Sequence, residues 1–211
     1  HYGIEVASMH SLLYNIDENM FISPTYRRFL TDYLQHAIKF AVRIKCPNLC
    51  FGCASNRTIP KGMDTSEAAR IAVDFFGDLA KYANENGVCI SIEPIAESDG
   101  TNFINYASQA FDLVKCVDDP GFKVNIDLGT IIENGEDIND IFTEEQLPLI
   151  NHIHLSEPHL APIQQRDIYI ETADLLEKLG YDKYVSLKLL EFPDVRLIQG
   201  AMNYFSSIFI R

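Results

Sequence analysis

The sequence predicts an α/β fold whose parallel strands close into a (β/α)8 barrel, the TIM-barrel architecture. Two observations lead to this prediction. Short apolar runs alternate with amphipathic segments of helical period along the 211 residues, and charged or ligand-type side chains follow the later runs. Alternating strands and helices make βα units, because a right-handed helical crossover is the ordinary connection between parallel neighbours. No glycine-rich phosphate fingerprint follows a predicted strand, which disfavours a dinucleotide-binding sheet.

The predicted elements follow from hydrophobic period and from start and stop residues. Pro24 favours the start of the first helix, Asp64 and Glu67 form a capping box for the second, and Gly87 and Gly180 end the second and fourth. The predicted strands cover residues 3–7, 48–53, 88–93, 122–127, 152–156 and 184–190, and the predicted helices cover 26–44, 64–86, 102–117 and 167–179.

Composition excludes several classes of partner. The formal net charge is -13 and the pI is about 4.8, so no basic surface is expected to bind nucleic acid or an anionic membrane. Five cysteines, with no secretory signal and no apolar run of spanning length, favour a reducing cytoplasm.

Three of these cysteines raise the question of an iron–sulfur cluster. Cys46, Cys50 and Cys53 have the spacing C-x3-C-x2-C, which resembles the radical-SAM signature. Residues 48–53 are predicted as a buried strand, however, and neighbouring positions on a strand face opposite sides. Cys50 and Cys53 then diverge, so we interpret the three thiols as reduced core cysteines.

Ligand-type side chains end four successive predicted strands. Glu93 ends SIEP, Asp127 ends NID, His154 lies in HIHLSEP, and Lys188 lies in VSLKLL. In a barrel the carboxyl ends of the strands form one mouth, where residues distant in sequence meet. Two carboxylates and an imidazole there are suited to Mn²⁺, Mg²⁺ or Zn²⁺.

With these segments in view, the chain resembles the sugar phosphate isomerase/epimerase family, which has a xylose-isomerase-like TIM barrel and includes ketose 3-epimerases. The resemblance is carried by SMHSLLYNIDENMFISPTYRR, CFGCASNR, SIEPI, TNFINYASQAFDLV, VNIDLGT and HIHLSEP. It implies that a Glu, Asp, His and Glu on successive strands hold a divalent metal, which acidifies a ketose C–H while the glutamates exchange the proton. Glu93, Asp127 and His154 match the first three ligands, whereas Lys188 stands in place of the second glutamate.

Lys188 changes the charge of the implied site. An ammonium about 4 Å from each of two carboxylates attracts each by roughly 4 kcal/mol at an effective dielectric of about 20, and it repels an incoming cation. We therefore expect Lys188 to substitute partly for the metal, with Mn²⁺, Mg²⁺ or Zn²⁺ bound weakly or absent. Two further departures are Thr130, where the 3-epimerases carry a His, and Leu160, where they carry an Arg.

Three more residues are expected to bind substrate at the mouth. Arg57 can clamp a phosphate or carboxylate, with a loop salt bridge as the alternative. His10 can face the substrate or serve as a hydrogen-bonded core histidine. Glu157 lies on a rim loop where solvation is the alternative, and His152 is expected to be structural because it lies deeper than His154.

The motifs also predict where the chain falls within a full barrel. They place residues 184–190 at the eighth strand and the first residues at the third, so residues 1–211 are expected to form a single, N-terminally incomplete TIM-barrel domain lacking about two βα units. Either a longer chain supplies about fifty more residues, or a partial barrel closes as a homo-oligomer.

The predicted function is that of a sugar or sugar-phosphate isomerase or epimerase with Glu93 and Lys188 as catalytic residues. Two alternatives remain open. One is a catalytically inactive barrel that binds a small carbohydrate, and the other is an enzyme in which Lys188 forms a Schiff base with a carbonyl substrate.

Overall fold

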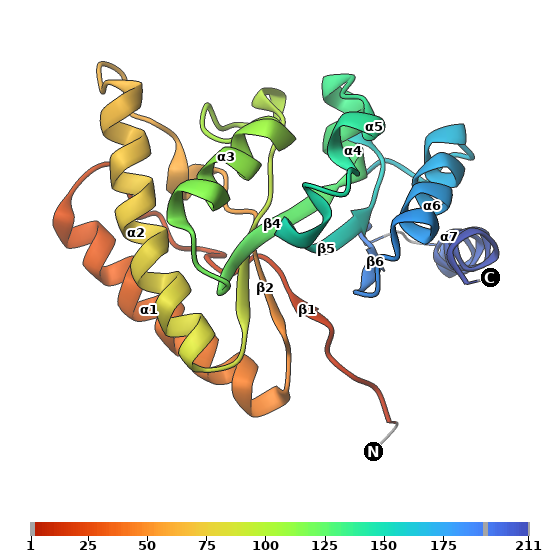
Figure 1. The fold of residues 1–211 in the computed structure, drawn as a ribbon, viewed down its shortest axis with the longest axis horizontal. Helices are drawn as coiled ribbons and strands as arrows, with labels where there is room; N and C mark the ends of the chain where they lie inside the picture. The colour runs from red at the N-terminus through yellow and green to blue at the C-terminus, as the bar shows by residue number, and fades with distance from the viewer. Residues whose placement is uncertain (1–2, 192–193, 211) are drawn as a thin grey trace.

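A computed structural model describes residues 3–191 and 194–210, and these form one parallel sheet with helices on its outer side (Figure 1). The six strands follow one another in chain order, and each is hydrogen-bonded in parallel to the next. They are β1 (Ser8–Met9), β2 (Asn48–Phe51), β3 (Cys89–Ile92), β4 (Phe122–Asp127), β5 (Ile150–Leu155) and β6 (Val185–Leu187). This sequential order is that of a TIM barrel, and the structure shows a six-stranded part of one.

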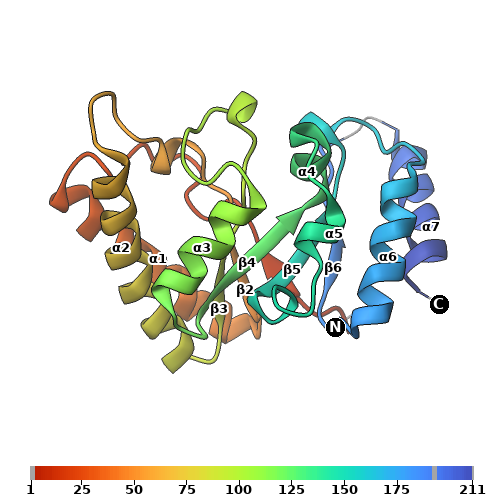
Figure 2. The ribbon, with the colours of Figure 1, turned by 45° about the horizontal axis from the view of Figure 1, so that its top comes forward.

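Three of the four predicted helices are closed by capping residues in the structure. The Ser23 hydroxyl accepts from the backbone of α1, the Asp64 carboxylate caps α2, and Gly180 ends α6 with a left-handed φ of 71°. The helices are α1 (Pro24–Ile44), α2 (Thr65–Glu85), α3 (Ala107–Val117), α4 (Leu128–Asn134), α5 (Ile138–Ile141), α6 (Asp167–Leu179) and α7 (Val195–Phe209). Figure 2 shows α6 and α7 side by side at one end of the sheet.

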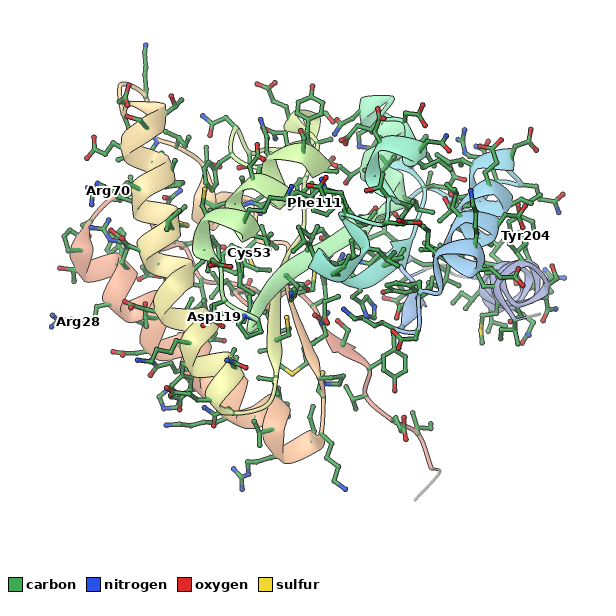
Figure 3. The ribbon with its side chains drawn as sticks, in the orientation of Figure 1. Arg28, Cys53, Arg70, Phe111, Asp119 and Tyr204 are labelled. Atoms are coloured by element: carbon green, nitrogen blue, oxygen red, sulfur yellow. The ribbon has the colours of Figure 1, made fainter. Side chains whose placement is uncertain are left out.

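The hydrophobic core lies between the helices and the convex side of the sheet. Aromatic rings join the two layers: Phe76 of α2 stacks on Phe122 of β4 with ring centroids 4.7 Å apart, and it meets Phe51 of β2 edge to face. Polar side chains such as Arg28 and Arg70 extend away from α1 and α2 into solvent (Figure 3). The opposite side of the sheet is thereby left to line the barrel interior.

Several predicted boundaries are wrong, chiefly at the sheet edges. The strand predicted at 3–7 lies instead at Ser8–Met9, and the strand predicted at 184–190 is reduced to Val185–Leu187. Ile4, in the first of these segments, is 81% exposed. Helices α4, α5 and α7 were missed, and α3 begins five residues late because the Asn105 amide binds the Ile95 and Thr101 carbonyls in an irregular loop.

The sheet is open between β1 and β6 in the part of the chain that the structure describes. A hydrogen bond of 3.2 Å from the Tyr184 hydroxyl to Glu5 crosses this gap. That two βα units complete the barrel remains a prediction. Among the described helices, none is long and apolar enough to cross a membrane.

Candidate functional site at the barrel mouth

A pocket of about 370 Å³ opens at the carboxyl ends of the strands. Its wall includes His10, Glu93, Asp127, Glu157 and Lys188, which come from the ends of five different strands. The structure therefore brings together most of the residues that the sequence singles out. His154 is buried outside the pocket wall and contacts Glu93.

Lys188 joins the two carboxylates of the site. Its Nζ donates to both Glu93 oxygens at 3.1 Å and to Asp127 Oδ2 at 2.8 Å, and its side chain is only 22% exposed. Burial alone would lower the pKa of this lysine, but the two carboxylates raise it well above its usual range. Lys188 is therefore an ammonium at neutral pH.

Glu93 accepts hydrogen bonds from every side. His10 Nε2 lies 3.1 Å from Oε2, while Asn125 Nδ2 donates to Oε1 at 2.9 Å and His154 Nδ1 lies 2.6 Å from the same oxygen. Burial raises the pKa of this carboxyl, but Lys188 and the two histidines outweigh it, so the pKa lies well below its usual range. Because an ionised carboxylate only accepts, the proton on each of these contacts belongs to the nitrogen.

Asp127 is held by the start of α4 as well as by Lys188. Its Oδ1 accepts from the backbone of Gly129 at 2.9 Å and of Thr130 at 3.2 Å, and from the Ser156 hydroxyl. A Cβ at position 129 would lie 2.6 Å from the Glu157 carbonyl oxygen, so only glycine fits there. The glycine of NIDLGT thus allows the helix cap to approach β5, which fixes the Asp127 carboxylate.

A second set of donor atoms lies beside the first. The side chains of His10, Cys50, Glu93 and His154 each offer one atom, and all four atoms lie within 4.8 Å of one another. Burial and the Glu93 carboxylate raise the pKa of the Cys50 thiol well above its usual range. At Gly52 a Cβ would collide with Glu93 Oε2 and lie 2.8 Å from His10 Nε2, so the glycine of CFG leaves the space in which these groups meet.

Two residues expected to bind substrate, Arg57 and Glu157, are buried and held by other protein groups. Arg57 is fully buried rather than open at the mouth, and its Nη2 donates to the Glu93 backbone carbonyl at 2.6 Å. This position does not support the predicted anion clamp, because loop packing closes over the guanidinium. Glu157 is buried rather than solvated, and it is held by Arg166 Nη2 at 2.8 Å and by the Tyr169 hydroxyl at 2.9 Å.

The remaining polar residues have structural roles. His152 Nε2 lies 2.9 Å from the Ser186 hydroxyl, and burial lowers the pKa of this histidine to about 4, so it is a neutral core residue. Cys46 and Cys53 are buried free thiols, as predicted for the core. Sequence reasoning missed Asn125, although its position two residues before Asp127 places it on the same face of β4.

The chain is similar in sequence to a known family and in fold to solved structures. The family described as xylose isomerase-like TIM barrel matches residues 1–207. The 3-keto-D-glucoside 4-epimerase of E. coli is 12% identical with a TM-score of 0.82, over 97% of this chain and 80% of its own. D-psicose 3-epimerase from Clostridium cellulolyticum H10, in a structure with D-tagatose, is 16% identical with a TM-score of 0.77, over 98% and 79%.

A third similar structure is that of an AP endonuclease. AP endonuclease, family 2, from Brucella melitensis is 19% identical with a TM-score of 0.76, over 97% of this chain and 78% of its own. At these identities the likenesses establish the fold alone. No functionally curated protein matches the sequence. Because the family match spans nearly the whole chain, the protein belongs to the xylose isomerase-like TIM barrel family.

Proposed function

We propose that this chain is a sugar isomerase/epimerase-like protein that binds a small carbohydrate at the barrel mouth, with the Lys188 ammonium in the place of a divalent metal. The observation that carries the proposal is the contact of one Nζ with both Glu93 and Asp127 in the pocket. The epimerases with the same fold support a sugar as the ligand.

The residues do not fit the metal site that the family resemblance implies. Glu93 and Asp127 carry two negative charges and Lys188 one positive charge, which leaves one net negative charge for a divalent ion. The ammonium already bonds both carboxylates, and at about 4 Å and an effective dielectric of about 20 each attraction amounts to roughly 4 kcal/mol before desolvation. A hard cation such as Mn²⁺ must displace this bonded ammonium.

The charges of the pocket favour a neutral sugar over a phosphorylated one. Within the described chain its wall carries four carboxylates, Glu93, Asp99, Asp127 and Glu157, and one lysine. Lys188 is committed to two of these carboxylates, and Arg57 is buried outside the wall. Sugar hydroxyls can donate to carboxylates, whereas a phosphate would meet a negative surface.

The same groups suit proton transfer beside a carbonyl. When a substrate oxygen replaces one of its carboxylate contacts, Lys188 can donate a hydrogen bond to the oxygen on which negative charge develops, and Glu93 lies beside it as the acceptor of the carbon-bound proton. For Glu93 to accept a proton, substrate must displace one of its donors, and His10 is the most exposed of these.

A second candidate, a carbohydrate-binding barrel without turnover, is favoured by the state of Glu93. Both of its oxygens are occupied by donors and its pKa is well below the usual range, which makes it a weak base. The Schiff-base alternative is disfavoured because Lys188 is held as an ammonium, and the nucleophile in that chemistry is the neutral amine.

The test uses chelator-treated protein with D-psicose, D-tagatose and D-fructose, each compared with its phosphate ester. Binding is measured by calorimetry, and exchange of the carbon-bound proton next to the carbonyl is measured by NMR in D₂O. We expect binding of a neutral ketose without added metal, loss of exchange in Glu93→Gln, and unchanged binding in the surface variant Arg70→Ala. Absence of binding by all the neutral sugars would contradict the proposal, and binding without exchange would select the second candidate.

A further inference from the structure

Four strands or strand ends direct one donor atom each to a common point beside the Glu93 carboxylate. His10 follows β1, Cys50 lies in β2, Glu93 follows β3 and His154 lies in β5, and their donor atoms are all within 4.8 Å of one another. This set shares Glu93 and His154 with the carboxylate set that the family resemblance implies. It lacks Asp127 and the residue at position 188, and it has the Cys50 thiol and the His10 imidazole instead.

We propose that His10, Cys50, Glu93 and His154 form a binding site for a thiophilic divalent ion, with Zn²⁺ as the physiological class and Co²⁺ as its spectroscopic probe. Thiolate, imidazole and carboxylate are the three donor types that bind tetrahedral zinc in proteins. The proposal goes beyond the proposed function, because it concerns a metal rather than the sugar and is tested without any sugar present.

The spacing of the donors is close to that of a four-coordinate site. Bond lengths of about 2.0–2.3 Å in a tetrahedron place neighbouring donor atoms about 3.3–3.8 Å apart. Glu93 Oε2 is 3.1 Å from His10 Nε2, and Oε1 is 2.6 Å from His154 Nδ1. An ion entering between them has to separate these pairs by small side-chain movements while it draws in the thiol, and no strand has to shift.

Charge distinguishes this set from the carboxylate set. When the Cys50 thiol gives its proton to solvent and the His10 Nε2 and His154 Nδ1 protons move to the other ring nitrogens, thiolate and Glu93 together carry two negative charges and balance a divalent ion. Asp127 then remains paired with Lys188 at 2.8 Å, so the ammonium keeps a partner after Glu93 turns to the metal. The carboxylate set offers no comparable balance, because Lys188 contacts both of its carboxylates, whereas in this set it contacts Glu93 alone.

One member of the set faces the solvent side. His10 is the exposed member and lines the pocket, whereas the other three members are buried. Because Gly52 has no Cβ, His10 and Glu93 can approach each other at 3.1 Å, where a Cβ would collide with Glu93 Oε2. The ion is expected to separate His10 from Glu93 in order to reach the buried thiol.

The experiment is an anaerobic titration of the reduced, full-length protein with Co²⁺ at neutral pH. A thiolate-to-cobalt charge-transfer absorption in the near ultraviolet is expected to saturate at one equivalent, and Zn²⁺ but not Mg²⁺ should abolish it. Cys50→Ser should remove this absorption and weaken binding by about 100-fold. The loss of a direct ligand should weaken binding at least as much as the loss of a residue that only supports a ligand.

Two thiol variants serve as controls. Cys53→Ser removes a buried neighbouring thiol outside the set, and Cys116→Ser removes an exposed thiol that could bind cobalt adventitiously. Both should keep the absorption and its stoichiometry. Its absence from the unaltered protein, its survival in Cys50→Ser, or its loss in Cys116→Ser would overturn the proposal.

A variant at an exposed position covers the case in which Cys50→Ser fails to fold. His10→Ala alters the accessible ligand, and its folding is checked by circular dichroism and thermal melting. It should bind Co²⁺ at least about tenfold more weakly while the charge-transfer absorption persists at high cobalt concentration. Unchanged affinity in a folded His10→Ala protein would exclude this four-residue site.

Discussion

The inner strands and the edge strands contribute differently to the site. β3, β4 and β5 are four to six residues long, and the side chains that they provide, Glu93, Asp127 and His154, are at most 4% exposed. β1 and β6 have two and three residues and only partial burial, and they provide His10 and Lys188. The residues that match the family pattern thus come from the interior, and the residue that departs from it comes from an edge.

This difference has a physical basis. An inner strand is hydrogen-bonded on both sides and packed under a helix, so its side chains have few alternative positions. An edge strand has a single neighbour, and a new side chain there meets less resistance. Lys188 therefore follows a strand that has a single neighbour in the described part of the sheet, yet its ammonium reaches two carboxylates of the inner strands.

The largest expected effect on stability comes from removing the Lys188 ammonium. Lys188→Met leaves Glu93 and Asp127 buried without their common partner, and the free energy of unfolding should fall by about 3–5 kcal/mol. Urea denaturation measures the loss, with exposed Lys61→Met as the matched control, which should change stability by less than about 0.5 kcal/mol. A loss below about 1 kcal/mol would show that Lys188 does not neutralise the buried pair.

Apolar truncations compare the two regions directly. Ile153→Ala on β5 removes a fully buried side chain and should cost about 2–5 kcal/mol. Leu187→Ala on β6 removes a half-buried side chain, and we expect a cost of about 1 kcal/mol, since the site is partly open to solvent. Equal losses in the two variants would mean that β6 is covered as fully as β5.

Alanine substitutions at two glycines should change the stability of the protein in opposite directions. Gly129→Ala drives a Cβ against the Glu157 backbone and should destabilise the protein by about 1–3 kcal/mol. Gly77→Ala in α2 has nothing within 4 Å of the new Cβ and should stabilise it by about 0.5–1 kcal/mol. Thermal melting of both variants decides the matter, and stabilisation by Gly129→Ala would refute the close approach of α4 to β5.

The smallest expected effect is on the outer surface. Arg70 Nη1 and Asp74 lie 3.3 Å apart on α2 with both side chains about two-thirds exposed. Arg70→Ala should lower the free energy of unfolding by about 0.3–0.5 kcal/mol. This loss should vanish in 1 M salt if it is electrostatic, and a larger loss would indicate that α2 is packed on that face.

Some inner elements were predictable from local signals, whereas the edge strands were not. The strand at Phe122–Asp127 and the helix at Asp167–Leu179 have the predicted bounds, because apolar runs and a terminal glycine mark them. β1 is shifted because its extent depends on pairing with β2, which lies forty residues away in the chain. The hydrophobic period of a segment carries no information about which distant strand it pairs with.

The part of the site that lies at the ends of strands was predictable from the sequence. Glu93, Asp127 and Lys188 lie together as the pattern at the ends of the strands indicates. Cys50 was considered only with its neighbours in sequence, whereas its contacts are with residues on other strands. The burial of Arg57 depends on how its loop packs against β3, which no spacing rule indicates.

The most direct test of the account is a calorimetric titration of Mn²⁺ into chelator-treated protein, comparing the unaltered chain with Lys188→Glu and Lys188→Met. Lys188→Glu restores a fourth carboxylate beside Glu93 and Asp127, whereas Lys188→Met removes the ammonium without adding a ligand. We expect about one equivalent of tight binding in Lys188→Glu and little in the other two, because Mn²⁺ prefers oxygen ligands and an ammonium repels it. Tight binding of Mn²⁺ by the unaltered protein would contradict the claim that Lys188 stands in the place of the metal.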